Sequence, residues 1–180
     1  LRRTNDQDLR RSMDNFSARI RSMALVHEQL YANTEYSHIK IEEYLQKLLR
    51  DITVQKTGCA GEIRVIMNAT PAEVDLRTAV PFGLIANEIL MNVCKHAYPD
   101  GRGGPVHVRV TVGGDGTIVF SVRDEGVGLP ERFNPEESKG IGLMLITGLA
   151  SQISADLSWR NEGGAYFELR IPPAVQHMSG

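Results

Sequence analysis

The sequence predicts an α+β protein, a two-layer α/β sandwich in which a mixed, mostly antiparallel sheet carries its helices on one face. Segments that read as strands meet at glycine-rich turns, Gly113 to Gly116 and Asn161 to Gly164, as adjacent antiparallel strands do. Longer segments with helical periodicity separate these strands along the chain. The chain has 180 residues and is 42% hydrophobic, which is enough for one core.

The first periodic segment predicts a helix that needs partner helices. Its apolar residues alternate at spacings of four and three, the a/d seam of a coiled coil or four-helix bundle, and charged residues cover the rest. The seam consists of Leu9, Met13, Phe16, Ile20, Met23, His27 and Leu30. We therefore expect residues 1–35 to be the C-terminal part of a dimerisation helical hairpin, residues 36–173 to be a separate domain and residues 174–180 to be a frayed tail.

The elements of the second domain follow from periodicity and turn residues. Helices are expected at 39–53, at 81–97 and at 141–153, the second of them opened by Pro81. Strands are expected at 62–67, 106–112, 117–122, 156–160 and 165–171. The polar stretch from Asp124 to Lys139 is longer than a typical connection, which favours a functional lid over a simple turn.

Composition limits the partners and the compartment. A formal net charge of -2 argues against nucleic-acid binding as the main task. The apolar stretch 141–150 is too short to cross a bilayer, so membrane contact is expected only through segments outside this chain. Cys59 and Cys94 are predicted to be buried or incidental thiols in a reducing, cytoplasmic compartment. Because the chain begins at Leu1 and not at a methionine, we expect a fragment of a longer protein.

The helix expected at 81–97 carries the first group of candidate functional residues. Steps of about 100° per residue place Glu88, Asn92, Lys95 and His96 within about a quarter of its circumference. A solvated helix face is the alternative for any single residue of this stripe. An amide between an acid and an amine is also suited to hold Mg²⁺ and to neutralise a triphosphate.

Two pairs of glycines form the second group. Gly126 and Gly128 follow Asp124 at a strand end, and Gly140 and Gly142 open the helix at 141–153, where free amides can face an anion. The motif is not a Walker A loop, because it lacks the terminal lysine and hydroxyl. It is not a dinucleotide fingerprint either, because Leu145 stands where the third glycine should be.

Taken together, these motifs resemble the ATPase superfamily that joins gyrase, heat-shock chaperones, histidine kinases and mismatch-repair proteins (GHKL). The stretch "PFGLIANEILMNVCKHAYP" resembles its N box, "DEGVGLP" its first glycine box and "GIGLMLI" its second. "IRSMALVHEQLY" is similar to the segment that follows the phospho-acceptor helix in histidine kinases related to the HWE subgroup. The resemblance covers nearly the whole chain.

The resemblance implies a Bergerat-type ATP-binding fold and a set of roles. It implies that Asn92 coordinates Mg²⁺, Lys95 contacts phosphate and Asp124 accepts a hydrogen bond from the adenine amino group. Glu88 would polarise the incoming nucleophile. His96 matches the usual N-box residue, with a capping or supporting role as the alternative to ligand contact. The glycine-box residues that would approach the base or the phosphates are Gly126, Gly128, Gly140, Ile141, Gly142 and Leu143.

The sequence departs from the family near the last strand. Relatives usually have Gly-Thr there, whereas Gly164 is followed by Ala165, so a hydroxyl near the adenine is missing and a weaker affinity for ATP is expected.

The resemblance implies an ATP-dependent protein-histidine kinase of a two-component system, with residues 36–173 as its catalytic ATP-binding domain. The phosphoryl group would pass to a histidine and then to an aspartate on a response-regulator receiver domain. The N-terminal helix would form a homodimer. His27 lies on the a/d seam, so the acceptor histidine is expected upstream of Leu1.

Two alternatives remain open at this stage. One is a GHKL serine kinase that restrains a sigma factor, although such a protein does not need the long bundle helix. The other is a catalytically silent phosphotransfer or docking module that keeps the fold without nucleotide. Nucleotide binding would separate this module from both kinases.

Overall fold

The computed structural model describes residues 24, 38–55, 62–131, 133 and 141–173 of the chain. Several predicted features lie outside the described residues. These are the helix expected within residues 1–35, apart from residue 24, the tail at 174–180, Cys59 and Gly140. In the order of the chain, the elements are β1 (His38–Lys40), α2 (Ile41–Gln55), β2 (Ile63–Ala69), β3 (Glu73–Asp75), α3 (Leu76–His96), β4 (Gly104–Val112), β5 (Ile118–Asp124), α4 (Ile141–Gln152), β6 (Asp156–Asn161) and β7 (Ala165–Ile171).

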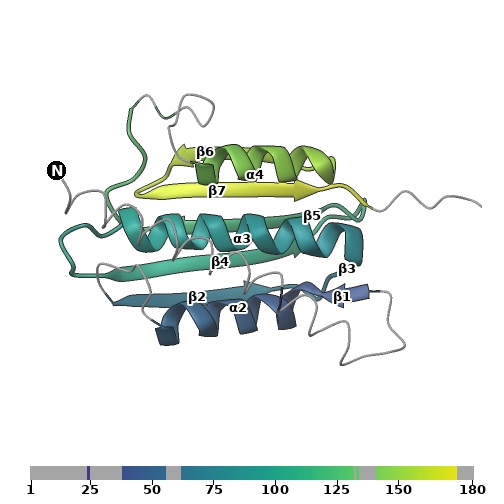
Figure 1. The fold of residues 1–180 in the computed structure, drawn as a ribbon, viewed down its shortest axis with the longest axis horizontal. Helices are drawn as coiled ribbons and strands as arrows, with labels where there is room; N and C mark the ends of the chain where they lie inside the picture. The colour runs from purple at the N-terminus through teal and green to yellow at the C-terminus, as the bar shows by residue number, and fades with distance from the viewer. Residues whose placement is uncertain (1–23, 25–37, 56–61, 132, 134–140, 174–180) are drawn as a thin grey trace, which may run out of the picture.

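A five-stranded sheet in the order β2-β4-β5-β7-β6 forms one layer of the molecule. The pair β2·β4 is parallel, and the pairs β4·β5, β5·β7 and β6·β7 are antiparallel. Figure 1 shows α2, α3 and α4 next to one another in front of this sheet. The predicted two-layer α/β sandwich with a mixed, mostly antiparallel sheet is therefore confirmed. A small antiparallel pair of three-residue strands, β1 and β3, was not predicted.

The core lies between the helices and the sheet. Alternate residues of β4 point into it, and Val106, Val108 and Val110 are each 1% exposed. From the helix layer, the Phe82 ring of α3 meets the Phe120 ring of β5 edge to face, with ring centroids 5.2 Å apart. Each such side chain stabilises the fold by about 1.5–3 kcal/mol through removal of apolar surface from water.

Helix α3 begins at Leu76, five residues before the predicted start at Pro81. Asp75 is the N-cap residue, and its Oδ1 accepts a hydrogen bond from the Thr78 N–H at 2.8 Å. This cap satisfies one of the free amides of the first turn and so sets the helix start. Pro81 lies inside the helix, where it is buried in the core, and was wrongly interpreted as the first helical residue.

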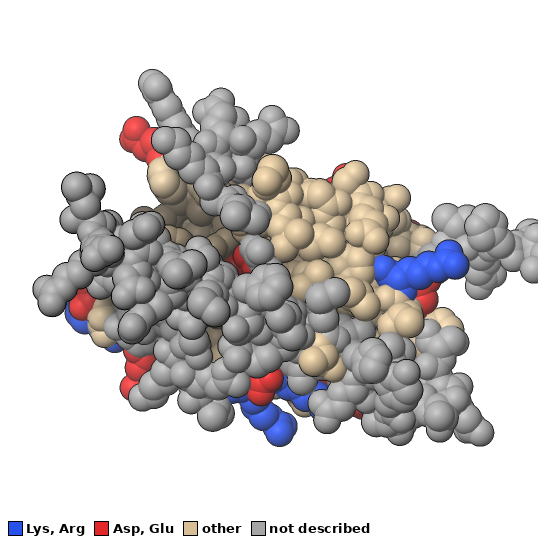
Figure 2. Space-filling model, viewed as in Figure 1, with Lys and Arg blue, Asp and Glu red and all other residues tan. Residues whose placement is uncertain are grey.

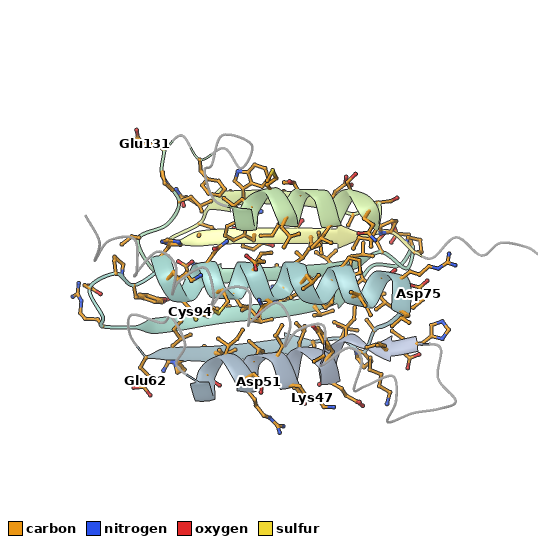
Figure 3. The ribbon with its side chains drawn as sticks, viewed as in Figure 1. Lys47, Asp51, Glu62, Asp75, Cys94 and Glu131 are labelled. Atoms are coloured by element: carbon orange, nitrogen blue, oxygen red, sulfur yellow. The ribbon has the colours of Figure 1, made fainter. Side chains whose placement is uncertain are left out.

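The prediction of two free thiols is also wrong for the residue that the structure describes. Cys94, near the end of α3, is disulfide-bonded and 4% exposed. Figure 3 labels Cys94 towards one end of α3 and Asp75 towards the other.

Among the described residues, no helix combines the length and the apolar character needed to span a bilayer.

Candidate functional site

The end of β5, the C-terminal half of α3 and the start of α4 enclose a cavity of about 470 Å³. Its walls are mostly apolar, with a few polar side chains. The residues that line it are Asn92, Val93, His96, Ala97, Asp124, Val127, Gly128, Leu129, Pro130, Phe133, Gly142, Leu143, Ala165 and Phe167. Figure 2 shows a largely uncharged surface over α4, with a hollow beside it in which acidic atoms are visible. A concave apolar site with few polar groups is typical of a small-molecule pocket.

Asp124, the last residue of β5, is the buried polar group of this cavity. Asp124 as a whole residue is only 1% exposed. Its Oδ1 accepts hydrogen bonds from the Gly126 N–H at 2.9 Å and from the Ala165 N–H at 3.1 Å. Among the described residues both bonds reach the same oxygen, so Oδ2 keeps its capacity to accept a hydrogen bond from a ligand.

Glycine is required on both sides of Asp124 because the backbone approaches very closely there. A Cβ on Gly126 would stand 2.0 Å from the carbonyl oxygen of Ala97, at the end of α3. A Cβ on Gly164 would stand 2.1 Å from the carbonyl oxygen of Asp124 itself. Only a residue without a side chain fits at either position. The carboxylate is thus held between α3 and β7 by contacts that larger residues would abolish.

The C-terminal end of α3 holds the loop that follows Asp124. The Val127 N–H donates to the Ala97 carbonyl at 2.9 Å. The Tyr98 hydroxyl accepts from the Glu125 N–H at 3.1 Å and donates to the Pro105 carbonyl at 2.7 Å. Tyr98 was not singled out by the sequence, because these contacts join residues that are far apart in the chain.

The predicted stripe on α3 divides into two groups in the structure. Asn92 and His96 line the cavity. Glu88 and Lys95 are not among the lining residues. Glu88 is 8% exposed, and its Oε2 lies 2.6 Å from the place where a Cβ of Gly142 would be. The buried carboxylate of α3 therefore sits directly beside the start of α4.

His96 is exposed at the cavity edge, and its environment disfavours the charged imidazolium. Partial burial, and secondly the neighbouring Lys95 ammonium, lower the pKa of His96 from its ordinary value. The neutral imidazole is therefore favoured in the absence of a ligand. An anion bound close by would oppose this effect and favour the proton.

Several residues of the two glycine boxes lie at the cavity. Gly128, Gly142 and Leu143 line the cavity, and Gly126 supports it through its hydrogen bond to Asp124. Ile141 is the first residue of α4, where backbone N–H groups lack partners within the helix. The cavity thus has a carboxylate at one wall and the start of a helix at another.

Aromatic rings that the sequence did not single out form a further wall. The Phe133 ring lies 5.9 Å from the Trp159 ring of β6 and 6.3 Å from the Phe167 ring of β7, in both cases edge to face. Asn161 at the end of β6 binds both backbone polar groups of Leu129. Asn161 was interpreted only as a turn residue, because its partner lies 32 positions away in the chain.

The described residues contain no group of three or more His, Cys, Asp or Glu side chains arranged to hold a metal ion. Mg²⁺ in nucleotide sites is usually held by one or two protein oxygens together with substrate phosphates and water. The amide oxygen of Asn92 suits that kind of site.

Family comparisons agree with this geometry. Residues 56–167 match the family described as histidine kinase-like ATPase domain, and residues 1–55 match a family described as histidine kinase. The Blue-light-activated histidine kinase 2 of Erythrobacter litoralis is 25% identical over 168 residues, which are 91% of this chain and 48% of that protein. The Sensor histidine kinase PdtaS of Mycobacterium tuberculosis is 27% identical over 175 residues, 95% of this chain and 34% of that protein. The chain thus spans half or less of the length of these curated relatives.

Solved structures show the same relationship. The histidine kinase domain of the Erythrobacter litoralis EL346 blue-light activated kinase superposes with a TM-score of 0.79 at 26% identity, covering 90% of this chain and 76% of that one. The ATP binding domain of PrrB from Mycobacterium tuberculosis gives a TM-score of 0.61 at 19% identity, covering 77% of this chain and 98% of that one. The second likeness shows the fold alone.

Proposed function

Because the chain belongs to the family of histidine kinase-like ATPase domains, we propose that it is the catalytic part of a sensor histidine kinase that binds Mg·ATP in this cavity. It would donate the γ-phosphate to a histidine, for onward transfer to an aspartate of a response regulator. The observation that carries the proposal is the buried Asp124 carboxylate, fixed by backbone N–H groups at the wall of an apolar cavity.

Asp124 would read the base. A carboxylate oxygen can only accept hydrogen bonds, so it attracts the amino group of adenine and repels the carbonyl oxygen that guanine has at the same place. The rings of Phe133 and Phe167 supply apolar surface around the base. These rings would support adenine binding where Ala165 provides no hydroxyl.

The phosphates would lie towards the start of α4. The N–H groups of its first turn, around Ile141, Gly142 and Leu143, can donate to phosphate oxygens, and the helix dipole favours negative charge there. Lys95 and Gly140 remain assigned to phosphate contact by resemblance. The Asn92 amide oxygen would hold Mg²⁺, and the ion would supply positive charge that offsets the charge of the phosphates.

Glu88 would polarise the attacking imidazole. Its carboxylate lies beside Gly142 and does not line the cavity, so it is near the proposed phosphate side. Catalysis would then consist mainly of positioning and charge neutralisation. His96 would lie close to the phosphates, either in contact with them or in support of Lys95.

The wider assembly is also proposed. Residues 1–35 would be the end of the dimerisation and phosphotransfer hairpin, and residues 36–173 the catalytic domain, with residues 174–180 as a tail. The burial of Tyr44, Leu45 and Leu48 of α2 in the common core supports placing α2 with the catalytic domain. We also propose a homodimer through the N-terminal helix, a cytoplasmic location and an acceptor histidine upstream of Leu1.

A silent docking module is the main alternative, and the built site argues against it. A docking module has no need of a buried carboxylate with two backbone donors or of glycines that no side chain could replace. The sigma-factor kinase shares the nucleotide site, but the match of residues 1–55 to a histidine kinase family favours histidine as the acceptor.

Phosphorylation tests the function, in a protein that carries this chain together with an acceptor histidine. We expect Asn92→Ala to abolish Mg·ATP-dependent formation of acid-labile phosphate while the fold stays intact, because Asn92 lines the cavity and is only partly buried. Radiolabel from [γ-³²P]ATP and circular dichroism would measure the two effects. Wild-type levels of phosphohistidine in the Asn92→Ala protein would contradict the assignment, and stable phosphate on His27 would contradict an upstream acceptor.

A further inference from the structure

A single side chain of β6 holds the loop that follows the Asp124 strand. Asn161 Oδ1 accepts from the Leu129 N–H at 2.7 Å, and Asn161 Nδ2 donates to the Leu129 carbonyl at 2.9 Å. The Asn161 side-chain amide thus forms hydrogen bonds with both the N–H and the carbonyl of Leu129, as the backbone of a neighbouring β-strand would. The two hydrogen bonds fix both the position and the orientation of the Leu129 backbone.

Gly128, the residue before Leu129, leaves room for this contact because it has no side chain. Gly128 has a φ of 77°, in the left-handed region that favours glycine. A Cβ at Gly128 would lie 2.7 Å from Asn161 Oδ1. A side chain at position 128 would therefore collide with the same amide that holds Leu129.

A second contact fixes the loop a few residues further on. The Phe133 N–H donates to the Pro130 carbonyl at 3.1 Å, which closes a turn. The Phe133 ring then packs edge to face against Trp159, two residues before Asn161 on β6, and against Phe167 on β7. Strands β6 and β7 hold both Leu129 and Phe133 in place.

Asn161 itself does not line the cavity, whereas Gly128, Leu129 and Phe133 do. We propose that Asn161 is a positioning residue for nucleotide binding, which presets the wall made by these three residues next to the Asp124 carboxylate. This inference rests on the proposed function, because it assigns the base of ATP to that wall. A loop that is already ordered does not have to be ordered when the ligand binds, so affinity rises without any direct contact.

Nucleotide titration of the 180-residue chain tests the proposal. Asn161→Ala removes both hydrogen bonds, and we expect it to weaken ATP binding about tenfold. Asn161→Asp keeps an acceptor for the Leu129 N–H but places a carboxylate oxygen against the Leu129 carbonyl, so a loss of about tenfold is expected here too. Ser158→Ala, on the exposed part of the same strand, is the matched control and should bind ATP as the wild type does.

The magnesium dependence separates positioning from a general structural role. Asn161 acts at the base, so the ratio of ATP affinities with and without Mg²⁺ should stay at its wild-type value in Asn161→Ala. Thermal unfolding, followed in parallel, reports any loss of stability, which by itself leaves the affinity of the folded protein unchanged. Wild-type affinity in folded Asn161→Ala, or an equal loss in Ser158→Ala, would overturn the proposal.

Trp159, the one tryptophan of the chain, gives a readout that needs no nucleotide. Release of the loop in Asn161→Ala should uncover its ring from Phe133 and increase quenching of its fluorescence by acrylamide. If the wild type bound no ATP, the proposed function would fail while the quenching experiment still tested the contact. Unchanged quenching in both Asn161 variants would show that Asn161 does not hold the loop.

Discussion

Asp124 is a buried residue whose side chain is held in place by the surrounding backbone. Its carboxylate is buried, and the Gly126 and Ala165 N–H groups hold one of its oxygens. Burial without these donors would cost several kcal/mol. The arrangement therefore fixes the carboxyl group in the place where, under the proposed function, an amino group of the base would meet it.

The first prediction concerns base selectivity. In Asp124→Asn, the amide oxygen can still accept from Gly126 and Ala165, which turns the –NH₂ group towards the ligand. We expect ATP affinity to fall about 10- to 100-fold, since a hydrogen bond to a charged group is worth about 1.5–3 kcal/mol. The preference for ATP over GTP should shrink as well. Competition between the two nucleotides for a fluorescent ATP analogue measures this, and an unchanged preference would rule out base recognition by Asp124.

Tyr98 supports the same carboxylate from outside the cavity. Its hydroxyl joins the Glu125 N–H to the Pro105 carbonyl, and its ring lies against Gly104, where a Cβ would stand 2.4 Å from a ring carbon. The backbone that follows Asp124 is thus tied through Tyr98 to the start of β4.

The second prediction follows from this contact. Tyr98→Phe keeps the ring and loses both hydrogen bonds, so we expect unfolding to become easier by about 1–2 kcal/mol and ATP affinity to fall about threefold. Urea denaturation and ATP titration measure these effects. Tyr166→Phe is the control, because the Tyr166 hydroxyl donates to Glu168 at the opposite face of the sheet. Equal ATP affinities for the wild type and Tyr98→Phe would show that Tyr98 is only structural.

At the scale of elements, α3 carries most of the site and depends on its first turn. Asp75 caps the helix, and its pKa is lowered mainly by a hydrogen bond from the Thr78 side chain and also by the Thr78 N–H. The opposite end of the same helix brings Asn92, His96 and the Ala97 carbonyl to the cavity. The N-cap therefore stabilises the helix whose other end lines the cavity.

The third prediction concerns this cap. Asp75→Ala should destabilise the protein by about 1 kcal/mol, while Asp75→Asn should retain most of the stability, because its amide oxygen still accepts from Thr78. Urea denaturation at neutral pH measures both variants. Equal stability of Asp75→Ala and the wild type would contradict the role of the cap.

The charge of Asp75 adds a pH dependence with a definite sign. Its folded pKa is lowered, so its contribution is complete above the unfolded value of about 3.9 and is lost as the pH falls through the lower folded value. Asp75→Asn should remove this part of the acid sensitivity. An identical decline of stability with acid in both proteins would show that Asp75 does not contribute to it.

The elements also show which features of the fold can be predicted from sequence. Strands β4 and β5 were predictable, because alternation along them matches burial and a glycine turn joins them. The start of α3 was not, because Pro81 resembles a first helical residue while the true cap, Asp75, follows the short strand β3. Three-residue strands are too short for periodicity to identify, so β1 and β3 were missed as well.

For the whole molecule, the site depends on contacts between distant parts of the chain. Asp124, Gly126 and Gly128 could be predicted because they form one local motif at the end of a strand. The supports of that motif could not, because Ala165 is 41 positions from Asp124 and Asn161 is 32 positions from Leu129. Only the pairing of β5 with β7 and of β7 with β6 brings these residues together.

Calorimetric titration of the chain with ATP, with and without Mg²⁺, tests the central claim most directly. Saturable binding of about one ATP per chain is expected, with a higher affinity in Mg²⁺ because Asn92 would hold the ion and its charge would offset that of the phosphates. Absence of binding at millimolar ATP would contradict the account and would favour a docking module that keeps the fold without the nucleotide.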